Sequence, residues 1–117
     1  MLPPKNHGGR QLFTGSMGKS KRFSNNLFSL ELLSLTYGQP PKMAVVVSKK
    51  HAKTAVLRNL IKRRIYAILI GELNNINNSV GIIVFTKAGL EGVDYKVLKE
   101  SLTTLLATTS SYNHKHV

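Results

Sequence analysis

The sequence contains no cysteine and only five acidic residues among its 117. The absence of cysteine excludes disulfides and thiolate metal sites, and it fits a protein of a reducing compartment. No stretch approaches the roughly 20 apolar residues of a membrane span. The N-terminus carries charges but lacks the apolar core of a signal peptide. Together these absences predict a cytoplasmic protein without a membrane segment.

The few acidic residues are scattered along the sequence, and this argues against a catalytic site built from carboxylates. A protein site that cleaves a phosphodiester needs clustered carboxylates for metal ions, or a poised acid and base. Glu31 stands alone in the basic part of the chain, and the other four acids are scattered over the rest: Glu72, Glu91, Asp94 and Glu100. The histidines do not pair with them in a metal-binding spacing, and no phosphate-binding glycine motif is present. The sequence therefore predicts a binding protein with no catalytic residue and no metal site of its own.

Positive charge is concentrated in the first part of the chain. Residues 1–64 hold 13 Lys and Arg against Glu31 alone, whereas residues 65–117 are balanced, so the formal charge of +12 lies in the first part. Seven of the 17 basic residues fall between Lys49 and Arg64, and no acid occurs from Leu32 to Gly71. Such a surface is unfavourable unless a polyanion neutralises it. Nucleic acid is thus the leading partner class, and an anionic membrane is the second.

The length fits one domain, residues 1–117, with loose tails at 1–9 and 108–117. Three stretches have strand patterns: Leu27–Leu35, Lys42–Val47 and Gly81–Thr86. Three have helical patterns: Arg10–Gly18, the basic stretch after Thr54, and Tyr95–Leu106 capped by Asp94. Lys19–Asn26 is predicted as a turn, as is Thr36–Pro41, which can join two antiparallel strands. We expect an α+β fold, a small two-layer sandwich with three to four strands in the order α-β-β-α-β-α.

The basic helix has two chemically different sides. It starts after the N-cap candidate Thr54 and has no Pro or Gly before Gly71. At about 100° per residue, the apolar side chains gather on one side: Leu57, Leu60, Ile61, Ile65 and Ile68. The opposite side is polar and mostly basic: Arg58, Asn59, Lys62, Arg63 and Tyr66. Arg64 projects into the apolar half and is expected at the rim of the core with its head in water.

The loop before this helix adds Lys49, Lys50 and Lys53 next to the free amides of the helix start, a combination that suits phosphate. A simply solvated basic face is the alternative. The absence of interspersed acids and the placement of Asn59 among the arginines favour the binding surface.

The stretch VVVSKKHAKTAVLRNLIKRRIYAIL, residues 45–69, resembles the protein subunit of bacterial ribonuclease P. That family carries S-K-K, a short basic loop, an A-V step and an R-N-x-x-K-R helix, found here as Ser48-Lys49-Lys50, Ala55-Val56, Arg58-Asn59 and Lys62-Arg63. Phe13–Arg22 is similar to the family's first helix and turn. GIIVFTKAG and DYKVLKESL are similar to its last strand and helix. Three positions depart from the pattern. Leu60 and Tyr66 stand where the family usually has arginine, and Met17 stands where it more often has an aromatic or aliphatic residue.

The resemblance implies a left-handed βαβ crossover at the basic helix, against the general right-handed preference. It also implies a subunit that binds the catalytic RNA of ribonuclease P and the 5′ leader of precursor tRNA, while RNA and Mg²⁺ carry out the hydrolysis. The implied RNA contacts are Lys49, Lys50, Lys53, Arg58, Asn59, Lys62, Arg63 and Tyr66. The implied leader cleft contains Phe13, Met17 and Arg22.

Two other functions stay open at this point. The first is a ribosomal or other structured-RNA binding protein without an enzymatic partner. The second is a cationic amphipathic protein acting at membranes, although the basic helix is embedded between two strands and aromatic anchors are sparse. Nothing in the pattern indicates an oligomeric state.

Overall fold

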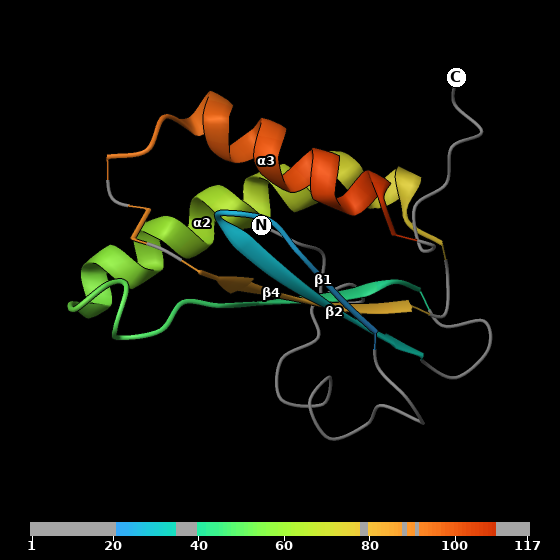
Figure 1. Ribbon diagram of the computed structural model, residues 1–117, viewed down its shortest axis with the longest axis horizontal. Helices are drawn as coiled ribbons and strands as arrows, with labels where there is room; N and C mark the ends of the chain where they lie inside the picture. Colours follow the sequence, from blue (N-terminus) through green and yellow to red (C-terminus); the bar gives the residue numbers. More distant parts are fainter. Residues whose placement is uncertain (1–20, 35–39, 78–79, 88, 91, 110–117) are drawn as a thin grey trace.

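The computed structural model describes residues 21–34, 40–77, 80–87, 89–90 and 92–109. In chain order its elements are β1 (Lys21–Ser24), β2 (Phe28–Ser34), β3 (Lys42–Val46), α2 (Ala55–Glu72), the short 3-10 helix η2 (Leu73–Asn75), β4 (Val80–Thr86) and α3 (Tyr95–Ala107). Figure 1 shows α2 and α3 together on one side of the sheet. The predicted α+β fold is therefore confirmed. The predicted helix at Arg10–Gly18 lies outside the described residues.

The described strands form one mixed sheet in the order β1-β2-β4-β3. β4 pairs antiparallel with β2 and parallel with β3, which makes β3, α2 and β4 a βαβ unit. β2 and β3 thus run in opposite directions, and β4 separates them. The reason is that β4 is almost wholly apolar and suits a central place with a partner on each side. Most of the turn predicted between β2 and β3, residues 36–39, lies outside the described residues. The predicted left-handedness of this βαβ crossover stays a prediction.

The prediction of a polar turn at Lys19–Asn26 is wrong for its middle part. Lys21–Ser24 forms the edge strand β1, which pairs with residues 29–32 of β2. Backbone pairing with a neighbour outweighs the polar composition here, and a short basic strand is a common way to protect a sheet edge. The turn is confined to residues 25–27, and the Oδ1 of Asn25 accepts hydrogen bonds from the amides of Leu27 and Phe28.

Asn25 also connects the β1–β2 turn to the last helix. Its Nδ2 donates to the carbonyl of Ser101 at 3.0 Å and to the Ser101 hydroxyl at 2.9 Å, across 76 positions of sequence. This side chain therefore fixes the hairpin against α3.

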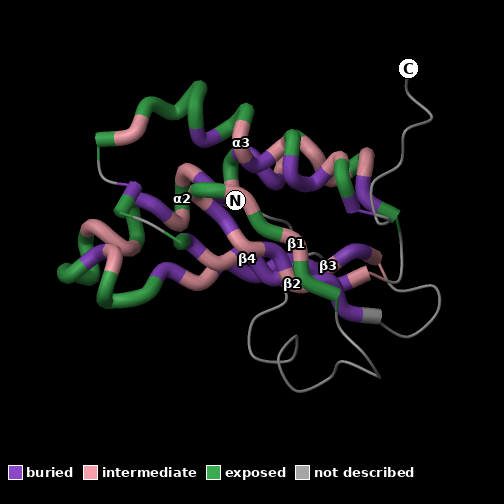
Figure 2. The backbone as a smooth tube through the Cα atoms, in the orientation of Figure 1, coloured by how far each residue is buried: buried purple, intermediate pink, exposed green. Residues whose placement is uncertain are grey.

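The main core lies between the sheet and the two helices, where the buried residues of Figure 2 concentrate. The sheet contributes alternate residues, among them Phe28, Leu30, Met43, Ile82 and Val84. The helices contribute the stripes Ile61, Ile65, Ile68 and Leu69 from α2, and Leu98, Leu102, Leu105 and Leu106 from α3. These stripes confirm the predicted apolar faces, with the exception of Leu60, which is 36% exposed. Thr109, within the stretch expected to be a tail, is buried beside the end of α3.

Candidate nucleic-acid interface

The loop between β3 and α2 has a defined shape. The carbonyl of Ser48 accepts hydrogen bonds from the amides of His51 and Ala52, both at 3.1 Å. Thr54 is the N-cap of α2, as predicted, and its Oγ1 accepts from the amide of Leu57 at 3.1 Å. The three lysines of the loop therefore extend from a folded turn, and all three are exposed.

Arg58 holds this loop from the first turn of the helix. Its Nη1 donates to the carbonyl of Ala52 at 3.0 Å and to the carbonyl of Lys53 at 3.3 Å, and the residue is half-buried. Sequence reasoning placed Arg58 on the outward face as an RNA contact. The structure shows that at least one nitrogen of the guanidinium is directed back to the loop. No sequence pattern signals this contact, because it depends on the path of the loop.

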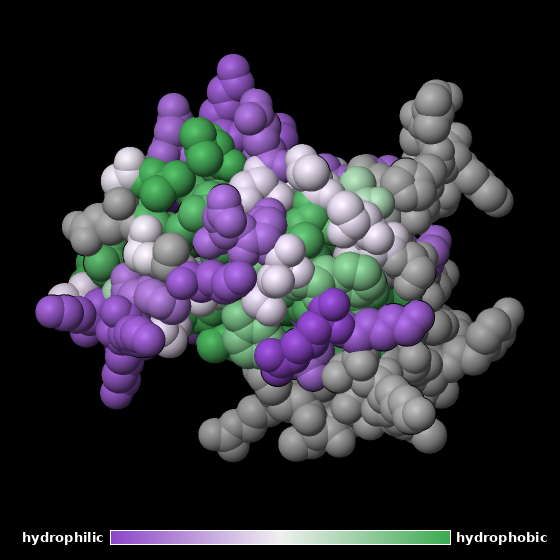
Figure 3. All heavy atoms as spheres, viewed as in Figure 1, coloured by the Kyte–Doolittle hydropathy of each residue, from purple (hydrophilic) through white to green (hydrophobic). Residues whose placement is uncertain are grey.

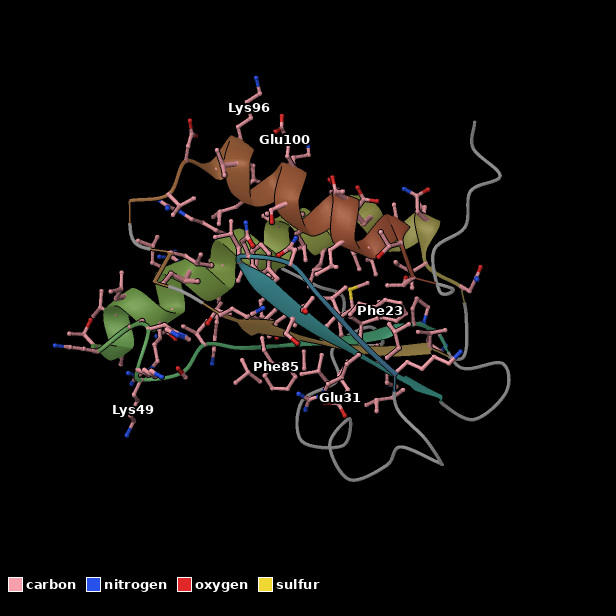
Figure 4. All side chains as sticks on the ribbon, in the orientation of Figure 1. Phe23, Glu31, Lys49, Phe85, Lys96 and Glu100 are labelled. Carbon is pink, nitrogen blue, oxygen red and sulfur yellow. The ribbon has the colours of Figure 1, made fainter. Side chains whose placement is uncertain are left out.

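The cationic side chains of the loop and helix lie at one end of the molecule. Lys49, Lys50, Lys53, Asn59 and Arg63 are exposed, and Lys62 is half-buried on the same helix. Lys49 extends away from the body of the protein in Figure 4, and hydrophilic side chains gather around this end in Figure 3. The first turn of α2 contains no acid. The arrangement presents ammonium and guanidinium groups beside a helix N-terminus, which favours polyanions.

Tyr66 lies differently from its basic neighbours on the helix. It is half-buried against the core, and its hydroxyl accepts a hydrogen bond from the amide of Val45 at 3.3 Å. Burial raises the pKa of the Tyr66 phenol above its ordinary value, and the Val45 amide offsets this in part. The hydroxyl thus pairs with a backbone group of the edge strand β3. Contact of Tyr66 with RNA stays a prediction.

Replacing Tyr66 by phenylalanine is expected to lower the free energy of unfolding by about 1 kcal/mol at neutral pH, because the hydrogen bond to Val45 is lost. The folded-state pKa is raised, so the unfolded chain releases this proton first. The contribution to stability is therefore constant below about pH 10 and falls above it. Urea unfolding of both proteins at neutral and alkaline pH measures this. An identical alkaline decline in the two proteins would contradict the assignment.

The sheet face turned away from α2 and α3 carries a second group of side chains. Leu33, Ala44 and Ile83 are buried there, and Val46 and Phe85 are partly buried. The register places Phe85 between Ser29 of β2 and Val46 of β3. Sequence reasoning identified residues 81–86 as a strand but did not single out Phe85 as a surface residue. The available signal was the two-residue period of a strand, which places Phe85 on the same face as Gly81 and Ile83.

Arg22 reaches this same face from β1. Its Nη2 lies 3.5 Å from Oε2 of Glu31, and its Cζ lies 6.0 Å from the centroid of the Phe85 ring. Figure 4 shows Glu31 and Phe85 on the same side of the sheet. The Arg22 side chain is 71% exposed, so the ion pair contributes little to stability and the guanidinium is open to a ligand. Phe13 and Met17, predicted to lie with Arg22, fall outside the described residues.

The structure thus groups the predicted residues in two places. The loop lysines and Arg58 follow the edge strand β3 in the chain, together with the outer residues of α2, and Arg22 lies on β1, the opposite edge strand. Among the described residues, no group of three or more His, Asp or Glu side chains is arranged to hold a metal ion. In the same part of the chain, no helix combines the length and apolar character needed to cross a membrane.

Comparisons of the sequence and of the fold with known proteins all find members of the same family. The family model described as Ribonuclease P matches residues 9–110. The ribonuclease P protein component of Pseudanabaena sp. (strain PCC 6903) is 31% identical over 108 residues, which covers 92% of this chain and 93% of that protein. Among solved structures, the Staphylococcus aureus RNase P protein superposes with a TM-score of 0.78 at 22% identity, covering 95% of this chain and all of that one. The RNase P protein of Thermotoga maritima gives a TM-score of 0.68 at 25% identity, covering 75% and 82%.

Proposed function

Because the chain belongs to the ribonuclease P protein family, we propose that it binds the catalytic RNA of that ribonucleoprotein and the 5′ leader of precursor tRNA. In this role it assists the Mg²⁺-dependent endonucleolytic removal of the leader, which is the 5′ maturation of tRNA. The observation that carries the proposal is the cationic loop and helix, residues 48–66, which contain no acid.

The loop and helix supply what a structured RNA requires of a binding surface. Phosphate contacts fix position and orientation without reading sequence, and lysine and arginine are the usual donors. Lys62 and Arg63 lie on a helix anchored by the buried Ile61 and Ile65, so they are held at a fixed spacing. Lys49, Lys50 and Lys53 extend from a turn fixed by Arg58 and Thr54. This preorganisation lowers the entropy lost on binding.

We assign the hydrolytic chemistry to the RNA and the Mg²⁺ that it binds. The described residues do not suit a resident Mg²⁺, since carboxylates would have to converge and they do not. Glu31 lies beside the positive charge of Arg22, and Asp94 caps α3. This chain's residues therefore bind and orient RNA, and their positive charge reduces the repulsion between two RNA molecules.

For the leader we propose the sheet face that carries Phe85 and Arg22. A partly exposed aromatic ring with a guanidinium beside it can stack on a base and pair with its phosphate. Stacking tolerates any base, and a surface that serves leaders of different tRNAs needs this tolerance. We propose that Phe13 and Met17 also contact the leader.

Replacing Phe85 by leucine keeps an apolar side chain on the sheet but removes the stacking surface. We expect the variant to bind precursor tRNA about fivefold more weakly, the equivalent of about 1 kcal/mol, with mature tRNA unaffected. Binding of both tRNAs to the reconstituted holoenzyme measures the difference. Phe13→Ala should behave in the same way. Equal losses for the two tRNAs would remove these residues from the leader site.

The decisive test of the proposed function is reconstitution with the cognate catalytic RNA at low Mg²⁺ concentration. Addition of the protein should increase precursor tRNA cleavage at a Mg²⁺ level where the RNA alone is slow. A structured-RNA binding protein of another class would bind RNA and leave cleavage unchanged, and this result would reject the proposal.

A further inference from the structure

Two adjoining hollows form a groove along the first half of α2, which we call the α2–α3 groove. One, of about 580 Å³, is lined by Lys50 and Lys53 of the loop and by Val56, Leu57 and Leu60 of the helix. The other, of about 420 Å³, shares Leu57 and Leu60 and continues to Arg64 and to Tyr95 at the start of α3. The two hollows thus adjoin at Leu57 and Leu60.

The floor of the α2–α3 groove is unusually apolar for an exposed surface. Four large hydrophobic residues are exposed among the described residues, and three of them line the groove: Val56 at 81%, Tyr95 at 42% and Leu60 at 36%. Figure 3 shows apolar side chains reaching the surface beside the start of α3. Exposed apolar side chains that gather in one hollow indicate a binding site more than scattered ones do.

The rim of the groove is cationic. Lys50, Lys53 and Arg64 line it, and Asp94 is the one acid among its lining residues. The Asp94 carboxylate is occupied, since its Oδ1 accepts a hydrogen bond from the amide of Lys96 and caps α3. A ligand that is complementary to both the apolar floor and the cationic rim needs a flat apolar body with a negative charge next to it.

We propose that the α2–α3 groove receives one unpaired nucleobase of the bound RNA, with the adjacent phosphates at Lys50 and Lys53. This proposal rests on the proposed function, since it deepens the RNA contact of the same loop. The base packs against Leu60 and the Tyr95 ring. These side chains contact the face of a base and not its edge, so the groove accepts any base that is free of pairing.

Continuity with the proposed RNA surface favours a nucleobase over a peptide. Lys50 and Lys53 belong both to the groove and to the cationic loop, so an RNA strand that follows the loop passes the mouth of the groove. A base in a duplex cannot enter, whereas a bulged base enters after losing little stacking. The groove therefore selects RNA by shape, at a place where the phosphates alone give no selectivity.

The test uses the full chain and three RNA hairpins of identical stem. The first has a single bulged 2-aminopurine, the second has no bulge, and the third has an abasic bulge. We expect the first to bind about fivefold or more tightly than the other two, with a change in 2-aminopurine fluorescence on binding. Leu60→Ser combined with Tyr95→Ser should abolish both the preference and the fluorescence change. Val97→Ser is the matched control, because Val97 is 49% exposed on α3 and does not line the groove.

The outcomes separate this inference from the proposed function. Equal affinity for the three hairpins, with binding that still requires Lys62 and Arg63, would overturn the inference alone. Failure to bind any of them, together with failure to stimulate cleavage, would overturn both. If an acidic leucine-containing peptide occupies the groove and the hairpins show no preference, the surface is a protein-docking site and the inference is wrong.

Discussion

Replacing both Lys62 and Arg63 by glutamate is expected to weaken binding to the ribonuclease P RNA about a hundredfold. Each side chain offers a charge-assisted contact to phosphate, and the loss of about 1.5 kcal/mol for each gives about 3 kcal/mol in total. The fold should persist, because Arg63 is exposed, Lys62 is half-buried and the core residues Ile61 and Ile65 are unchanged. Single Arg63→Ala should cost about 1 kcal/mol or more by the same reasoning.

The matched control places the same change of charge elsewhere. Lys96 and Lys99 are exposed on α3, and Figure 4 shows Lys96 directed away from the end of the molecule that carries Lys49. Lys96→Glu with Lys99→Glu should reduce affinity only slightly. Equal losses in the two double variants would mean that net charge alone controls binding, and would contradict a defined surface.

Salt dependence gives a second measurement on the same proteins. If six phosphates are engaged, the slope of log K against log salt should be on the order of −4 to −5 for the unmodified chain. Loss of two phosphate contacts should reduce the slope by roughly 1 to 2. A slope near −1 for the unmodified chain would contradict phosphate contacts as the basis of binding.

Arg58→Ala is expected to be the most damaging single change at the interface, with RNA affinity reduced about thirtyfold. The change removes a cation, and it also leaves the carbonyls of Ala52 and Lys53 without their guanidinium donor. The loop lysines then lose their fixed positions. We expect about 2 kcal/mol of lost binding energy and a decrease of about 1 kcal/mol in the free energy of unfolding.

A double-mutant cycle separates the two roles of Arg58. If it positions the loop, Lys50→Ala should cost less in the Arg58→Ala background than in the unmodified chain, with a coupling of about 0.5 kcal/mol or more. Arg63→Ala should be additive with Arg58→Ala. Arg58→Lys keeps the charge but lacks the planar fork, so it should restore little of the affinity. Full additivity with Lys50→Ala and full rescue by lysine would show that Arg58 acts only as a phosphate contact.

The helix and its cap could be predicted from sequence because their causes are local. Thr54 caps the chain where the 3.6-residue periodicity begins, and the buried stripe of Ile61, Ile65 and Ile68 follows directly from that period. The same holds for Asp94 and the leucines of α3. The loop lysines were identified because a run of basic residues without acids needs no structure to be recognised.

The features that sequence reasoning missed depend on partners distant in the chain. β1 forms because its backbone pairs with β2, whereas the sequence of Lys21–Ser24 alone does not favour a strand. Leu60 fits the apolar side by angle, yet the start of α3 leaves it at a groove instead of covering it. The inward hydrogen bonds of Arg58 and Tyr66 likewise depend on where the loop and β3 run.

The central position of β4 has a consequence for biosynthesis. Because β4 is the shared neighbour of β2 and β3 but is translated after both, a nascent chain that ends before residue 80 holds two strands with no common partner. Of the described sheet, only the β1–β2 pair can form at that stage, and the late, non-local closure of the rest slows folding. During this interval two strand edges are open to other nascent copies. The excess of 12 positive charges on residues 1–64 is already present at that stage, and repulsion between like-charged copies opposes their association.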